Sequence, residues 1–178
     1  MRRRLLFLAP IVPDRVGNGL AMRTGLMLDA CARHFDVDLA VVPVATTATE
    51  LSDFACSRSR RAVMVPLGGP DTHFGLLARL SDPRVRVAAF RRYGRPTICA
   101  RLTAEVETRV LAFAGADDYA AVHVSRLYLA EMAGRWISRR DRPRLILDCD
   151  ENDAAVQRSL AALARRRGQD GASQAQWA

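Results

Sequence analysis

The sequence predicts an α/β fold: a Rossmann-like, doubly wound and mostly parallel sheet with helices on both of its faces. Short apolar runs alternate along the chain with segments of helical spacing. These runs are continuously apolar, as in strands that are buried on both faces. The chain has 178 residues, 49% of them hydrophobic, and can therefore bury a core of ordinary size. We expect residues 1–167 to form one domain and residues 168–178 to form a flexible tail or the start of a missing connection.

The first elements are a strand, a helix and a second strand. Leu5–Ala9 is continuously apolar and predicts a buried strand. Leu20–Phe35 predicts a helix because its apolar side chains recur at near-helical spacing, and Arg33 and His34 suit the negative end of the helix dipole. Val37–Val44 then predicts the second strand.

The next elements are shorter. Thr49–Ser57 suggests a short helix, and Ala62–Leu67 predicts a third strand that a Gly-Gly-Pro sequence ends. The stretch 71–82 suggests a helix that is capped by Asp71 or Thr72 and ended by the proline that follows it.

The second half begins with an uncertain stretch and then returns to the alternation. Val85–Arg101 has no clean period, and we expect it to be mostly irregular. Thr103–Gly115 predicts a helix with a threonine N-cap, early glutamates and a terminal glycine. Tyr119–Ser125 predicts a strand, Tyr128–Arg139 a helix and Arg144–Asp150 another strand.

A final helix is expected over Asp153–Arg167, with acidic residues before it and arginines at its end. The acidic residues also form a cluster at the end of the last strand. Paired carboxylates can bind a metal or exchange protons, but acids at a helix start also cap it. We favour capping for Asp153 and leave both interpretations open for Asp148 and Asp150.

The net charge of +8 does not by itself indicate a nucleic-acid partner. All 27 basic residues are arginines, as a GC-rich coding sequence would produce, and most are scattered along the chain. Basic residues are also not interleaved with aromatic ones, as they are in many single-strand binding proteins. We therefore expect no nucleic-acid partner.

The four cysteines show no metal-site spacing, and their apolar surroundings predict buried free thiols: Cys31, Cys56, Cys99 and Cys149. The basic and apolar N-terminus imitates a signal peptide, but Pro10 interrupts it and no cleavage site follows. We expect a cytoplasmic protein, and contact with the inner membrane face stays open.

Ligands of doubly wound sheets bind outside the carboxyl ends of the strands. Three polar loops of this chain are expected there: Pro10–Gly19, Ser125–Tyr128 and Asp148–Asp153.

The first of these loops is a candidate phosphate-binding loop. Gly17, Asn18 and Gly19 precede a helix, where glycines allow close approach and the helix N-terminus favours an anion. Arg23 lies one turn into that helix and is within reach of a phosphate. The dinucleotide fingerprint fails at Met22, however, and the chain has no lysine for a P-loop. A plain turn is the alternative interpretation.

His123 is the candidate catalytic residue. It lies close to the carboxyl end of an apolar strand, just before Ser125 and Arg126. A hydrogen-bonded core histidine is the alternative interpretation.

Four stretches together resemble the N-terminal half of GT-B-fold glycosyltransferases, and in particular the large retaining family often numbered four. They are "LAPIVPDRVGNG", "LAMRTGLMLDACARHFDVDLAVV", "YAAVHVSRLYLAEMA" and "PRLILDCDENDAAVQRSLAALAR". The resemblance spans most of residues 4–167. It implies one half of a GT-B fold, and a complete enzyme that transfers a sugar from a nucleotide-sugar donor to a glycan, lipid or small-molecule acceptor.

The resemblance also implies roles for single residues. The Gly17–Gly19 loop would approach the donor phosphate, with Arg23 near that charge. His123 matches the first histidine of an H-x-H-like strand end, and Ser125 departs from the second. "LDCDEN" matches an acidic strand end, with Cys149 and Glu151 as variants.

GT-B enzymes of this type typically need no metal, and we expect no cofactor. The donor-binding C-terminal domain has no counterpart in these residues, so we expect no turnover by this chain alone. The implied partners are a separate donor-domain chain or a second copy of this chain. A non-catalytic, Rossmann-like module that binds a nucleotide or a partner protein is the alternative function.

Overall fold

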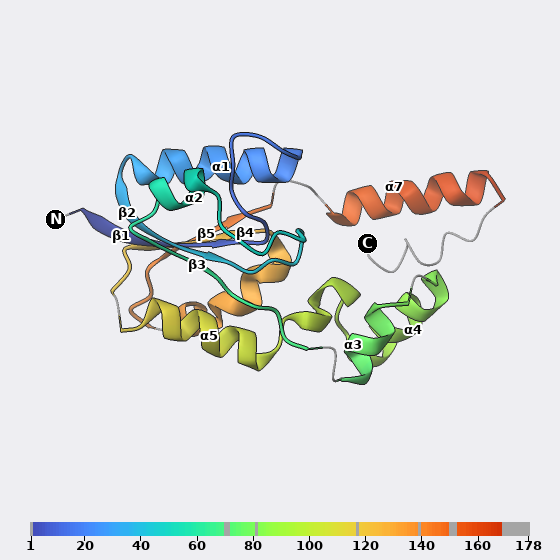
Figure 1. Cartoon of the computed structure of the whole chain (residues 1–178). Helices are drawn as coiled ribbons and strands as arrows, with labels where there is room; N and C mark the ends of the chain where they lie inside the picture. The colour runs from blue at the N-terminus through green and yellow to red at the C-terminus, as the bar shows by residue number, and fades with distance from the viewer. Residues whose placement is uncertain are drawn as a thin grey trace. The chain divides into compact units, whose positions relative to one another are not determined.

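The computed structural model describes residues 2–69, 72–80, 82–116, 118–138, 140–149 and 153–168 (Figure 1). The chain divides into two compact units. Unit 1 is formed by Met1–Gly68 and Leu102–Asp148, and unit 2 by Gly69–Arg101 and Cys149–Ala178.

Unit 1 contains a five-stranded, all-parallel sheet in the order β3-β2-β1-β4-β5, and this confirms the predicted Rossmann-like α/β fold. Its strands are β1 (Arg3–Ala9), β2 (Phe35–Val41), β3 (Arg61–Met64), β4 (Ala121–Ser125) and β5 (Arg144–Asp148). The segments between them are α1 (Gly19–Ala32), α2 (Asp53–Ser57), α5 (Ala104–Ala114), the 3-10 segment η2 (Leu127–Ala133) and α6 (Gly134–Ile137).

Helices cover both faces of the sheet. Figure 1 shows α1 and α2 on one face and α5 on the other. Phe7 of β1 belongs to the core under α1 and α2, together with Leu28 and Ala55. Because side chains alternate along a strand, Leu6 and Leu8 face the α5 side, and both are fully buried. The central strand is therefore buried on both faces, as its continuous apolar sequence predicts.

The order of the strands creates a switch point between β1 and β4. The chain first builds outward from β1 to β2 and β3, and later adds β4 on the other side of β1. The loops after β1 and β4 therefore leave the sheet toward opposite faces at its carboxyl edge, which is where doubly wound sheets bind their ligands.

The edge strand β5 is the exception to this burial. Ile146 is 37% exposed and Leu147 is 45% exposed, although the two side chains point to opposite faces. Both faces of β5 therefore carry uncovered apolar surface.

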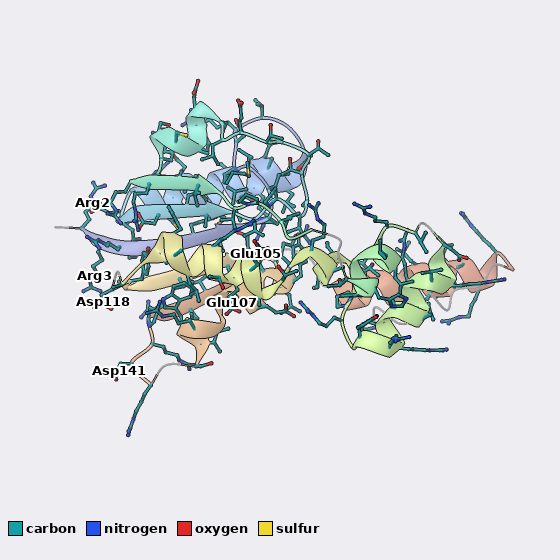
Figure 2. The ribbon with its side chains drawn as sticks, turned by 60° about the horizontal axis from the view of Figure 1, so that its bottom comes forward. Arg2, Arg3, Glu105, Glu107, Asp118 and Asp141 are labelled. Atoms are coloured by element: carbon teal, nitrogen blue, oxygen red, sulfur yellow. The ribbon has the colours of Figure 1, made fainter. Side chains whose placement is uncertain are left out.

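A buried carboxylate lies at the opposite, amino-terminal end of the sheet. Asp38 of β2 is fully buried and accepts hydrogen bonds from Arg60, Arg61 and the Tyr119 hydroxyl, with the closest atoms of each partner at 2.5, 2.7 and 2.9 Å. These partners join β2 to the start of β3 and to the segment before β4. Figure 2 shows further charged side chains at this end of the sheet: Arg2, Arg3, Asp118 and Asp141.

Unit 2 contains α3 (His73–Ala78), α4 (Pro83–Tyr93), the 3-10 segment η1 (Thr97–Arg101) and α7 (Asp153–Arg166). Phe74, Ala89 and Ala100 form its small core. Thr72 caps α3, since its hydroxyl accepts a hydrogen bond from the Gly75 amide at 3.1 Å.

The expectation that Val85–Arg101 is mostly irregular is wrong. Residues 83–93 form α4, which Asp82 caps and which ends at Gly94 with a φ of 64°. Pro83, expected only to end the preceding helix, occupies the first turn of this one, where its missing N–H costs no hydrogen bond. Four of its eleven residues are arginines, and among its described side chains only Ala89 is fully buried.

Two further expectations are corrected. Where one helix over Tyr128–Arg139 is expected, Leu127–Ala133 forms the 3-10 segment η2 and Gly134–Ile137 the single turn α6, and Arg139 lies outside the described residues. The thiols are not uniformly buried: Cys99 is buried and Cys31 is half-buried, but Cys56 and Cys149 are exposed because they lie on a short surface helix and just after the edge strand.

Candidate functional site

The loop after β1 is held by its own backbone and by Asn18. The Asn18 side chain accepts a hydrogen bond from the Ala21 amide at 3.0 Å and caps α1. Gly17 has a φ of 109°, which a side chain would strain. A Cβ atom at Gly19, by contrast, would meet no atom within 4 Å. The helix N-terminus therefore opens onto unoccupied space at Gly19.

The same loop crosses closely over α1 at Gly25. A Cβ atom there would lie 2.1 Å from the Asp14 carbonyl oxygen, so only glycine fits. The Asp14 amide also donates to the Ala21 carbonyl at 3.1 Å. This close approach fixes the path of the loop over the helix.

Arg23 of α1 pairs with Asp148 at the end of β5. Its Nη2 and Nε lie 2.7 and 3.3 Å from the two carboxylate oxygens. The Arg23 side chain is 47% exposed and that of Asp148 is 14% exposed, so the pair lies at the rim of the site. The pair ties α1 to the edge strand.

His123 is 1% exposed and stacks on Phe7, its register partner in β1, with ring centroids 4.3 Å apart. Neither of its ring nitrogens has a hydrogen-bond partner within the described residues. Burial lowers the pKa of His123; the charge of Asp148 raises it and that of Arg23 lowers it further, and the net shift is downward. The ring is therefore neutral at pH 7.

Ser125 is also buried, at 3% exposure, and its Oγ has no partner in the described part of the chain. It pairs in register with Asp148. Among described residues other than glycine, Arg126 alone has a positive φ, 78°, so the backbone is strained where β4 ends.

The fold brings several predicted site residues together at the carboxyl edge of the sheet, on the same face of it. His123, Ser125 and Asp148 share the face of Phe7, because they alternate in register across β1, β4 and β5. Arg23 reaches this face from α1. The candidate Asp150, like Glu151, lies outside the described residues, and so does the side chain of Asp153.

This arrangement can bind a polar ligand. Leaving a buried polar group without a partner costs about 1–3 kcal/mol, and two such groups lie here side by side on β4. A neutral imidazole can donate at one nitrogen and accept at the other, which suits a hydroxyl group. The α1 N-terminus supplies positive potential at the rim, where the charge of Arg23 is paired with that of Asp148.

The described residues hold no group of three His, Cys, Asp or Glu side chains that could bind a metal ion. None of their helices is both long and apolar enough for a membrane span.

A hollow of about 370 Å³ lies against α1, and neither His123 nor Ser125 lines it. It is lined by Arg15, Met22, Gly25, Leu26, Asp29 and Phe54. No buried polar side chain without a partner lines it, so it is the weaker candidate for a specific site.

Two residues that shape the site were not predicted from the sequence. Phe7 shapes it by stacking on His123 but belongs to a plain apolar strand. Gly25 shapes it through the loop crossing, and a glycine inside a helical pattern is the signal that marks such a close approach.

Comparison with protein-family models, with curated proteins and with solved structures found no match to this chain. Its function is therefore inferred from the residues of the site.

Proposed function

We propose that this chain is the acceptor-side domain of a GT-B-type glycosyltransferase, similar to the retaining family numbered four. In the assembled enzyme a sugar would pass from a nucleotide-sugar donor to a glycan, lipid or small-molecule acceptor. The observation that carries the proposal is the pair of buried side chains His123 and Ser125, which have no hydrogen-bond partner among the described residues and lie at the switch point of the sheet, on the face that α1 covers.

The N-terminus of α1 suits the phosphates of the donor. Gly19 leaves room for a ligand, and the amides of the first helical turn favour an anion. Arg23 contributes a guanidinium one turn further on, and a phosphate would compete with Asp148 for it. Neutral His123 suits a sugar hydroxyl, for which it can be both donor and acceptor.

Sugar transfer requires the donor and the acceptor to be held together in a closing cleft. In such an enzyme the described five-stranded sheet would form one of the two Rossmann-like domains. We therefore expect these 178 residues to bind ligand without turnover.

The alternative is a non-catalytic module that binds a nucleotide or a partner protein. One observation favours it: Asp148 already neutralises Arg23, so a phosphate gains less from this arginine than from one without a carboxylate partner.

Calorimetric titration with a panel of nucleoside diphosphates and nucleotide-sugars tests the proposal. We expect saturable binding of a nucleotide-sugar that Gly19→Ala and Arg23→Ala each weaken about tenfold, or about 1.4 kcal/mol. Gly19→Ala is informative because its Cβ meets nothing in the unliganded protein. Arg33→Ala is the matched control, since Arg33 also pairs with a carboxylate, that of Asp29, at the other end of α1.

Absence of binding by the folded protein to every member of the panel would contradict the proposal. Binding of plain nucleotides with no preference for a sugar would favour the non-catalytic module.

A further inference from the structure

The β5 edge of the sheet is open. β5 is the last strand in the order and pairs only with β4 among the described strands. Proteins usually protect such an edge with a central charge, a proline or a bulge. The middle of β5 is instead Leu145, Ile146 and Leu147, and the latter two are 37% and 45% exposed.

The free edge offers its hydrogen-bonding groups at two residues. The Arg144 amide donates to Ala120, and the Asp148 carbonyl accepts from Arg126, so even-numbered residues of β5 point toward β4. Because these groups alternate along a strand, the N–H and C=O groups of Leu145 and Leu147 point away from the sheet.

The sequence of β5, Arg-Leu-Ile-Leu-Asp, complements itself when it is reversed. Antiparallel pairing centred on Ile146 places Arg144 opposite Asp148 and Leu145 opposite Leu147. The two leucines then exchange backbone hydrogen bonds, and Ile146 meets its own copy at the close, non-hydrogen-bonded position. Parallel pairing in register would instead place like charges opposite one another.

We propose that β5 pairs with β5 of a second copy of this chain around a two-fold axis at Ile146. The axis is perpendicular to the sheet, so the same face of both copies lies on the same side. Two five-stranded sheets then join into one continuous sheet. This edge fits a second copy of the same chain because, in this register, each charged residue faces an opposite charge of the other copy and each apolar residue faces an apolar one.

Asp148 keeps its bond to Arg23 in this arrangement. A carboxylate has two oxygens with several acceptor positions, so it can also accept from Arg144 of the second copy. The interface therefore adds a partner to Asp148 without leaving a charge unpaired.

Sedimentation velocity across a concentration series tests the pairing. We expect a reversible dimer, and we expect Leu147→Arg to weaken its association at least tenfold because two arginines then face the apolar edge. Leu26→Arg is the matched control: Leu26 is 71% exposed but lies on α1, beside Phe54 of α2. A parent protein that stays monomeric at every concentration would overturn the proposal, as would equal weakening by both variants.

Disulfide formation tests the register. In a background with Cys56→Ser and Cys149→Ser, we expect Ile146→Cys to cross-link two copies under mild oxidation. Leu147→Cys is more exposed in the single chain, but in the dimer it faces Leu145 and should cross-link much less. Equal cross-linking of the two variants, or cross-linking of Leu147→Cys alone, would show that β5 does not pair in this register.

Discussion

His123 determines how the site responds to pH. Its pKa is lowered in the folded state, so the folded protein binds its proton less readily than the unfolded chain does. The stability that accompanies the neutral ring is fully present above about pH 6.5, the ordinary histidine pKa, and is lost as the pH falls below it.

We expect His123→Phe to remove this part of the pH dependence. The phenyl ring keeps the stack on Phe7 and has no buried nitrogen to protonate. Urea unfolding of both proteins at pH 7.5 and pH 5.5 provides the measurement. The parent should lose more stability than the variant between the two pH values, and parallel losses would contradict the expectation.

Arg126 stores backbone strain beside the site. At a φ of 78°, glycine is less strained than any residue with a Cβ atom. We expect Arg126→Gly to be about 1 kcal/mol more stable than Arg126→Ala, the reverse of the usual order in a regular element. Comparing these two variants removes the effect of losing the arginine side chain. A more stable alanine variant in thermal unfolding would show that the strain is absent.

At the scale of elements, the loop after β1 and helix α1 act as one piece because they touch at Gly25. We expect Gly25→Ala to destabilise the fold by about 1–3 kcal/mol, since its Cβ would meet the Asp14 carbonyl. Gly19→Ala, with open space around its Cβ, is the control and should not be destabilising. Chemical unfolding of both variants measures the difference, and equal stabilities would show that the loop moves aside.

Asp38 joins three segments at the other end of the sheet. Burial would raise the pKa of its carboxyl, but hydrogen bonds from Arg61, Arg60 and Tyr119 outweigh burial and lower it. The ionised Asp38 carboxylate therefore stabilises the fold above about pH 3.9, the ordinary pKa of an aspartate in the unfolded chain. This contribution is lost as the pH falls through the lower pKa of Asp38 in the folded protein.

We expect Asp38→Asn to cost about 3 kcal/mol at pH 7, because two arginines then lose their buried counter-charge. Urea unfolding at pH 7 and at pH 3 should show a smaller difference between variant and parent at the lower pH. A constant difference would show that the charge of Asp38 is not what matters.

The elements that the sequence predicted well are those with a strong local pattern. β1, α1 and β4 have continuous apolar runs or a helical period, so their positions followed from the chain itself. α4 was missed because four of its eleven residues are arginines and, among its described side chains, only Ala89 is fully buried.

Contacts between distant residues were less predictable. The sequence placed Arg23, His123 and Asp148 at one edge of the sheet, because parallel strands end together. It did not predict the pairing of Arg23 with Asp148, which depends on β5 lying next to β4. The Asp38 cluster was missed for the same reason, because its members come from three separate segments.

For the whole molecule, the open β5 edge links stability to concentration. If only folded chains pair, mass action stabilises them further as the concentration rises. We expect the thermal midpoint of the parent to rise with protein concentration and that of Leu147→Arg to rise less over the same range. Scans over a hundredfold range measure this. A constant midpoint for the parent would contradict it.

If the site binds an anion as proposed, the ion pair between Arg23 and Asp148 also links that binding to the protonation of His123. Asp148 raises the pKa of His123 and Arg23 lowers it. An anion that draws the guanidinium away leaves the carboxylate as the stronger neighbour, so the imidazole gains basicity as the ligand binds. Binding should therefore take up a fraction of a proton and tighten as the pH falls. In calorimetry, the apparent enthalpy would then vary with the ionisation enthalpy of the buffer, and His123→Phe would abolish that variation.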